Sequence, residues 1–319
     1  MTTPANSQEP ARIAVAGAGR IGREHIRAIR RSPRLVLAGV ADPSEQARAA
    51  YAAEGVAVAA DVEALLSATP VDAVIVAVPS AHHLPLVARL LERGVPVLCE
   101  KPCGLRSAEL VELGKRAAEL GTPLQIGYWR RFVPSLRALR ARIADGSMGE
   151  LSMVTAIQWD GEPPSAAFRD VASSGGILID MGVHEFDMLR WLTGQEIVEL
   201  TGFASDVNYA EPVPGDPETV NLVARMSGGT TAFVSLARRY PPGDVCRVEV
   251  LGGEATEQLT FVEPGDAGDM LIDAFRAQAE HLAQIACGAQ PEGATLDDAL
   301  AALVAAEAGT ATFAAAAAR

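Results

Sequence analysis

The stretch Ala11-Arg12-Ile13-Ala14-Val15-Ala16-Gly17-Ala18-Gly19-Arg20-Ile21-Gly22 decides the fold. An apolar run leads directly into three glycines spaced as Gly-x-Gly-x-x-Gly, and a helical pattern follows over residues 22–31. Such glycines allow a tight turn and let a pyrophosphate approach the N-terminus of the helix. The stretch therefore predicts the start of a dinucleotide-binding domain, with these cofactor-binding residues: Gly17, Gly19, Arg20, Ile21 and Gly22.

Continuous apolar runs alternate with helical stretches through the first part of the chain. The runs lie at 13–16, 35–40, 71–78, 95–99 and 124–128, and the helical stretches lie near 22–31, 45–54, 61–68, 82–93 and 107–120. Runs without polar alternation are typical of parallel strands that helices cover on both faces, with right-handed crossovers. We expect an α/β Rossmann domain with a doubly wound parallel sheet over residues 11–128, after a flexible N-terminus of residues 1–10.

The pattern changes after an Arg-rich helix at 134–144. Apart from a helical segment around 180–192, strands follow one another without helices between them, at 151–159, 197–207, 219–226, 230–238, 245–251 and 256–262. Glycine pairs between them, Gly228-Gly229 and Gly252-Gly253, are hairpin signals. We expect an α+β domain over 129–319 whose mostly antiparallel, open-faced sheet packs one face on helices and offers the other for association. Helices near 268–287 and 296–316 close the chain, and the last is long enough to pack back on the first domain.

Composition limits the kind of partner. The 319 residues are 49% hydrophobic and 21% charged, which is typical of a globular protein of two domains. The net charge of −13 argues against nucleic-acid and membrane surfaces. No apolar run reaches the roughly 20 residues of a membrane span, and residues 1–10 lack a signal-peptide pattern. We expect a cytoplasmic homodimer or homotetramer that acts on a small molecule.

Polar residues follow the predicted strands where a cofactor would lie. Asp42 comes 20 residues after Gly22, where a carboxylate accepts hydrogen bonds from ribose hydroxyls and repels a 2′-phosphate, so NAD is expected rather than NADP. Ligands of such sheets bind beyond the carboxyl ends of strands, which adds these cofactor-binding residues: Val78, Pro79, His83, Glu100 and Lys101. The alternatives are helix capping and packing for His82 and His83, and a surface ion pair for Glu100 and Lys101.

Lysine is rare in this chain. Of 27 basic residues only Lys101 and Lys115 are lysines, and Lys115 lies in a polar, solvated helical stretch. Arginine keeps its proton in proteins, whereas a lysine amine can release one. Lys101 is therefore a candidate for proton chemistry.

The segment 175–192 mixes ionisable and apolar residues. Its helical pattern predicts that Asp180, His184 and Asp187, at i, i+4 and i+7, share one face. Burying such a face costs free energy unless the polar groups have partners or a task, so we predict acid/base chemistry for His184. A core histidine and a metal site completed by Glu185 or Asp187 are the alternatives. With five histidines and no second His motif, we predict no metal, and a structural role for Asp187.

The glycine fingerprint, Glu100-Lys101-Pro102, the segment 127–132 and the segment 175–192 resemble the Gfo/Idh/MocA oxidoreductases over nearly the whole chain. The similarity is greatest to the inositol 2-dehydrogenase branch. It implies NAD-dependent oxidation of a secondary hydroxyl of a cyclic polyol or sugar, with Lys101, Asp180 and His184 around the hydroxyl, and a cis Lys101-Pro102 peptide. Trp129 stands where many relatives have Asn, and the loop 160–174, expected to line the substrate pocket, matches no pattern.

Oxidising an alcohol requires a base and a group that stabilises the developing alkoxide. We assign His184 as the proton acceptor, Lys101 as the cation that holds the oxygen and Asp180 as the orienting carboxylate, although Lys101 and His184 are exchangeable. Arg131 and Trp159 are candidate substrate contacts, with a buried Arg–carboxylate pair and a core Trp as the alternatives. An NAD-dependent glycosidase of the same superfamily and a dinucleotide sensor without turnover remain open.

Overall fold

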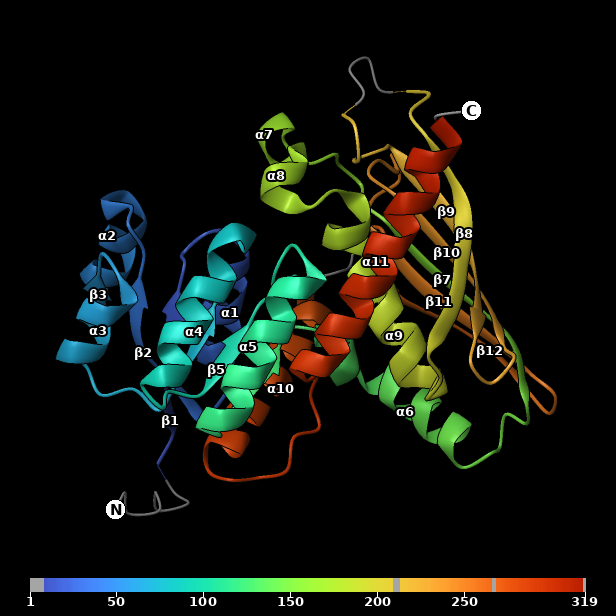
Figure 1. Ribbon diagram of the computed structural model, residues 1–319. Helices are drawn as coiled ribbons and strands as arrows, with labels where there is room; N and C mark the ends of the chain where they lie inside the picture. Colours follow the sequence, from blue (N-terminus) through green and yellow to red (C-terminus); the bar gives the residue numbers. More distant parts are fainter. Residues whose placement is uncertain (1–8, 209–212, 266–267, 318–319) are drawn as a thin grey trace. The chain divides into compact units, whose positions relative to one another are not determined.

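A computed structural model describes residues 9–208, 213–265 and 268–317 (Figure 1). The chain divides into two compact units, the first made of Met1–Gly104, Ala108–Trp129 and Leu271–Asp297, the second of Leu105–Ser107, Arg130–Met270 and Asp298–Arg319. Most of the expected flexible N-terminus, residues 1–8, lies outside the described residues.

The first unit contains a six-stranded sheet in the order β3-β2-β1-β4-β5-β6, and every neighbouring pair is parallel. Its strands are β1 (Ala11–Ala16), β2 (Leu35–Ala41), β3 (Ala57–Ala59), β4 (Ala73–Val76), β5 (Val97–Cys99) and β6 (Leu124–Ile126). The predicted Rossmann doubly wound sheet is confirmed. The sequence pattern missed β3, because three half-buried residues at a sheet edge give no periodic signal.

Helices cover this sheet and fix its core. They are α1 (Arg20–Arg31), α2 (Glu45–Ala53), α3 (Val62–Ala68), α4 (His83–Glu92), α5 (Ser107–Leu120) and α10 (Gly268–Ala286), with a 3-10 turn η1 (Ser80–His82). Leu282 and Ile285 of α10 belong to the same buried cluster as Ile13, Ile26 and Ile75. This apolar contact explains why residues 271–297, assigned from the sequence to the second domain, group with the first unit.

The second unit contains a mixed sheet in the order β12-β11-β7-β10-β9-β8. Its strands are β7 (Leu151–Trp159), β8 (Ile197–Ser205), β9 (Thr219–Met226), β10 (Thr231–Ala237), β11 (Val245–Gly252) and β12 (Thr256–Val262). Only β7 and β10 pair in parallel, so the mostly antiparallel sheet is confirmed. The parallel pair brings the carboxyl ends of β7 and β10 to the same edge, with Trp159 opposite Ala237.

The other elements of this part of the chain are mostly short. They are η2 (Trp129–Phe132), α6 (Pro134–Ala144), α7 (Ala166–Arg169), α8 (Val171–Ser174), η3 (Leu178–Gly182), α9 (Val183–Thr193) and α11 (Leu296–Ala317). The final helix, expected to pack on the first domain, belongs to the second unit from Asp298 onward. There a Cβ atom on Gly309 would lie 2.7 Å from Leu178 and 3.2 Å from Leu200, so a glycine permits the close packing. No described helix is long and apolar enough to cross a membrane.

Candidate functional site

The glycine turn between β1 and α1 forms an open cradle. Gly17 has φ +97°, and a Cβ atom on Gly22 would lie 1.9 Å from the carbonyl oxygen of Gly17. Nothing lies within 4 Å of a Cβ atom on Gly19, the N-cap of α1. The first turn of α1 has neither a side-chain cap nor an acidic residue. A helix N-terminus of this kind fits a pyrophosphate, whose negative charge its N–H groups attract.

Asp42 lies directly after β2 and is tied to this turn. Its Oδ2 atom accepts the backbone N–H of Ala18 over 2.7 Å, and Oδ1 accepts that of Ser44 over 2.8 Å. A carboxylate oxygen has more than one acceptor position, so a half-buried Asp42 retains capacity for ribose hydroxyls.

His83 links the segments that follow β4 and β5. Its Nδ1 atom lies 2.7 Å from the carbonyl oxygen of Pro102, and Nε2 lies 2.8 Å from that of Val78. The ring is buried, and burial lowers the pKa of His83 although both carbonyls act in the opposite direction. The imidazole is therefore in a packing position, as the sequence analysis allowed, and it holds Val78 beside the segment that carries Lys101.

Glu100 points into the first unit and not toward the surface. Its Oε1 atom lies 2.7 Å from Nε2 of His25 in α1, and Oε2 accepts the backbone N–H of Lys101 over 3.2 Å. His25 is fully buried and stacks on Phe275 at 4.4 Å. The surface-pair interpretation of Glu100 is therefore wrong, because its side chain is only 7% exposed. The Lys101-Pro102 peptide is cis, as the resemblance implied.

In the second unit, the prediction of one regular α-helix over residues 180–192 is wrong for its first residues. Leu178–Gly182 forms a π-helical turn, and regular α-helix begins at Val183. His184 and Asp187 lie on α9 and are buried, whereas Asp180 lies in the π turn and is partly exposed. Asp180 and Asp187 therefore take different partners.

The paired arginines of η2 hold α9 in place. Nε and Nη2 of Arg131 donate to the two carboxylate oxygens of Asp187 over 3.0 and 2.6 Å, and Arg131 also lies 3.0 Å from Asp298. Arg130 and Glu185, both buried, pair at 2.6 Å. The alternative given for Arg131, a buried Arg–carboxylate pair, is thus present, and the substrate contact of Arg131 remains a prediction. Glu185 and Asp187, the extra ligands of the metal interpretation, are engaged by arginines.

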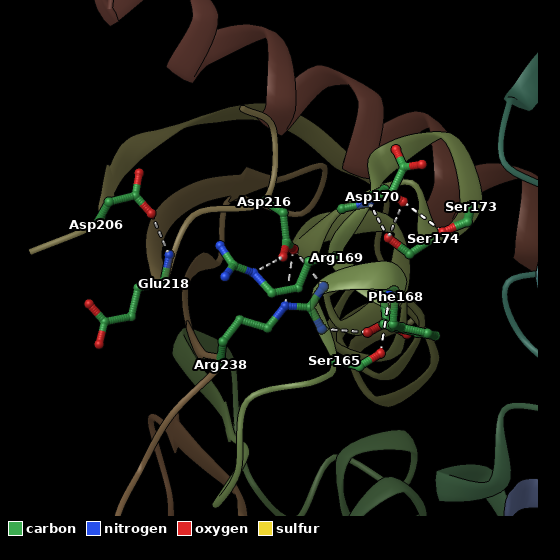
Figure 2. Close-up of polar contacts among 12 residues, drawn as sticks. Ser165, Phe168, Arg169, Asp170, Ser173, Ser174, Asp206, Asp216, Glu218 and Arg238 are labelled. Carbon is green, nitrogen blue, oxygen red and sulfur yellow. Dashed lines mark hydrogen bonds and ion pairs between the residues drawn. The ribbon is translucent and has the colours of Figure 1, made fainter. Parts of the chain in front are cut away.

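Asp180 belongs to a second ionic network, in which Figure 2 labels Arg169, Asp216 and Arg238. Arg238, directly after β10, donates through Nη1 to Oδ2 of Asp180 over 2.6 Å. Its Nε and Nη2 atoms donate to Oδ1 of Asp216 over 3.0 and 2.6 Å. Nε of Arg169 in α7 donates to the other oxygen of Asp216 over 3.2 Å. Nothing in the sequence pattern singles out Arg169 or Asp216, and the signal for Arg238 is its place at the end of a predicted strand.

The carboxyl end of β7 lies at the same sheet edge. Nε1 of Trp159 donates to Oγ of Ser235 over 3.1 Å, and its ring lies 5.0 Å from that of Tyr240. Burial raises the pKa of the neighbouring Asp160, while a hydrogen bond from Gln158 lowers it. Trp159 is half-buried, so its predicted contact with a sugar or polyol ring remains a prediction.

These features define a class of protein: a Rossmann domain with an open phosphate cradle, joined to an α+β unit that carries a buried ionic network. Two family models match, "Oxidoreductase family, NAD-binding Rossmann fold" over residues 11–128 and "GFO/IDH/MocA C-terminal domain" over residues 136–257. The chain belongs to the Gfo/Idh/MocA family of oxidoreductases.

Relatives of known name cover most of the chain. It is 44% identical to the rhizopine catabolism protein MocA of Rhizobium meliloti over 94% of each chain. It is 33% identical to an inositol 2-dehydrogenase of the same species over 76% of this chain and 73% of that one. Among solved structures, a myo-inositol dehydrogenase from Corynebacterium glutamicum matches with TM-score 0.86 and 27% identity, over 96% of this chain and 97% of that chain.

Proposed function

We propose that the protein is an NAD-dependent dehydrogenase that oxidises a secondary hydroxyl of a cyclic polyol or sugar to a ketone. The observation that carries this proposal is the partly exposed Asp180, paired with Arg238 and one turn before His184. A carboxylate beside an imidazole suits proton removal from an alcohol. The similarity to an inositol 2-dehydrogenase and to a rhizopine catabolism protein supports a polyol-type substrate.

The residues of the first unit would hold the cofactor. The N-terminus of α1 with Gly17, Gly19 and Gly22 receives the pyrophosphate, and Asp42 accepts hydrogen bonds from the adenosine ribose. A ribose 2′-phosphate would face the negative charge of Asp42, which favours NAD over NADP. When bound, the nicotinamide supplies the acceptor for the hydride that leaves the substrate carbon.

Three side chains would act on the hydroxyl. His184 accepts its proton, Lys101 holds and polarises its oxygen, and Asp180 orients the hydroxyl or the imidazole. The roles of Lys101 and His184 are exchangeable, since either side chain can accept a proton when it is neutral. Trp159 offers a ring face to the apolar side of the substrate.

A substrate panel tests the proposal against its alternatives. Inositol isomers, rhizopine, pyranoses and anhydrosugars are each incubated with NAD and, separately, with NADP, and NADH or NADPH is followed by absorbance. We expect net NADH formation with at least one cyclic polyol, and little signal with NADP. Cleavage of a glycoside without net NADH would indicate the NAD-dependent glycosidase. Cofactor binding without turnover of any compound would indicate the sensor.

We also propose that the protein is a homodimer or homotetramer. In β9 every second residue is buried, while Val223 and Arg225 between them are exposed. On the same sheet Met153, Leu251 and Phe203 are exposed as well, Phe203 to 79%. Apolar groups on an open sheet face favour association with a second copy. Light scattering of the purified protein checks this, and a monomer would contradict it.

A further inference from the structure

We infer that Arg238 is the positioning residue for Asp180: anchored by Asp216, it fixes the direction and the negative charge of the carboxylate that works beside His184. This inference rests on the proposed dehydrogenase function. Among the described residues, the network joins four charged side chains that come from η3, α7, the segment before β9 and the end of β10.

Arg238 contacts two carboxylates: Asp216, which anchors its guanidinium, and Asp180, which it orients. Nε and Nη2 point to one oxygen of Asp216, and Nη1 points to Asp180. The planar guanidinium is rigid, so fixing two of its nitrogens on Asp216 also fixes the direction of the third. Figure 2 shows Asp216 between the side chains of Arg169 and Arg238. The orientation of Asp180 is therefore set from a point deeper in the protein.

Burial distinguishes the two ends of the network. Asp216 and Arg238 are 0% and 1% exposed, whereas the side chain of Asp180 is 14% exposed. Asp216 already has Arg169 as a second cationic partner, so neutralising Asp216 does not require Arg238 to reach Asp180. The end of the network that a substrate can reach is Asp180.

The charges around Asp180 explain why a cation is needed there. Asp160 lies close enough for its charge to interact with that of Asp180, and His184 follows one turn later. The positive charge of Arg238 interacts favourably with the carboxylates of both Asp160 and Asp180. Without it, two carboxylates would share a poorly solvated site without the cation that pairs with Asp180, which favours protonation of one of them. Arg238 thus sets a positive charge against the Asp180 carboxylate through the same 2.6 Å ion pair that fixes its direction.

The test measures kcat, KM and the pH profile of kcat/KM for wild type, Arg238→Gln and Arg238→Lys, with the polyol that wild type oxidises best. We expect Arg238→Gln to lower kcat about 10-fold or more and to move the acid limb up by about one pH unit, because the cation is lost. Arg238→Lys keeps the positive charge but lacks the planar guanidinium that binds Asp216 and Asp180 at the same time. It should return the acid limb to its wild-type position while kcat stays reduced. Arg169→Gln, which removes the other cation on Asp216, is the matched control and should leave the acid limb unmoved.

The outcomes separate this inference from the proposed function. An acid limb that stays unmoved in a folded Arg238→Gln, with only a lower melting temperature, would show a structural role and overturn the inference alone. If Arg238→Gln does not fold, a wild-type kcat in Arg238→Lys would overturn it. A wild type without turnover on any polyol would overturn the proposed function, and the inference with it.

Discussion

The two units build their candidate sites from different materials. In the first unit the candidate phosphate cradle consists of backbone: Gly17, Gly19 and Gly22 bring the chain into a tight turn at the N-terminus of α1. In the second unit the candidate site is made by side chains, and Asp180 is held by Arg238 from 58 residues away. A backbone site depends on the absence of side chains, whereas a side-chain site depends on charges that balance each other in a buried environment.

The largest expected effect is a loss of NAD affinity at Gly22, where the backbone of the turn is too close for a side chain. Gly22→Ala places a methyl group 1.9 Å from the carbonyl oxygen of Gly17, so the turn must open. We expect NAD binding to weaken roughly 100-fold, equal to about 2.7 kcal/mol, as measured by calorimetric titration. The matched control is Gly268→Ala, whose new methyl group meets nothing within 4 Å. Equal NAD affinity in the two variants would show that the turn is not the cofactor cradle.

A second prediction concerns the structural pair of the second unit. Asp187→Asn removes the carboxylate that accepts two hydrogen bonds from Arg131, 7% exposed, and leaves Asp298 at 3.0 Å as its acidic partner. Removing one partner of a buried pair costs about 3 kcal/mol of the free energy of unfolding, which urea denaturation measures. The KM for the polyol should stay unchanged while the protein is folded, because Arg131 then serves α9 and not the substrate. If Asp187→Asn raises the KM for the polyol without lowering the free energy of unfolding, Arg131 contacts the substrate after all.

The smallest effect concerns His83 in the first unit. Burial lowers its pKa below the ordinary value of 6.5, so on acidification the unfolded chain takes up a proton before the folded protein does. The contribution to stability is therefore present above about pH 6.5 and decreases as the pH falls toward the folded-state pKa. Between about pH 7.5 and 5.5 we expect wild type to lose more stability than His83→Leu.

Chemical denaturation at several pH values measures this difference. Parallel slopes for wild type and His83→Leu would mean that His83 is protonated equally in the folded and unfolded states.

The contrast between the units also explains what the sequence predicts. The order of strands and helices, Asp42 and the cis Lys101-Pro102 peptide lie where local patterns and the resemblance placed them. The network of Asp216 and Arg238 was missed, because the two residues come together only when β9 and β10 pair antiparallel and set the start of β9 beside the end of β10. The π turn at Asp180 was missed as well, since a 3.6-residue period cannot reveal an irregular turn.

The most direct measurement compares Lys101→Ala with His184→Ala, one variant in each unit. Steady-state kinetics with the best polyol gives kcat, and calorimetric titration gives the Kd for NAD. We predict that each variant lowers kcat by about 10²-fold or more and leaves the Kd for NAD nearly unchanged. Wild-type turnover in either variant would contradict the proposed roles of Lys101 and His184 in the oxidation of the hydroxyl.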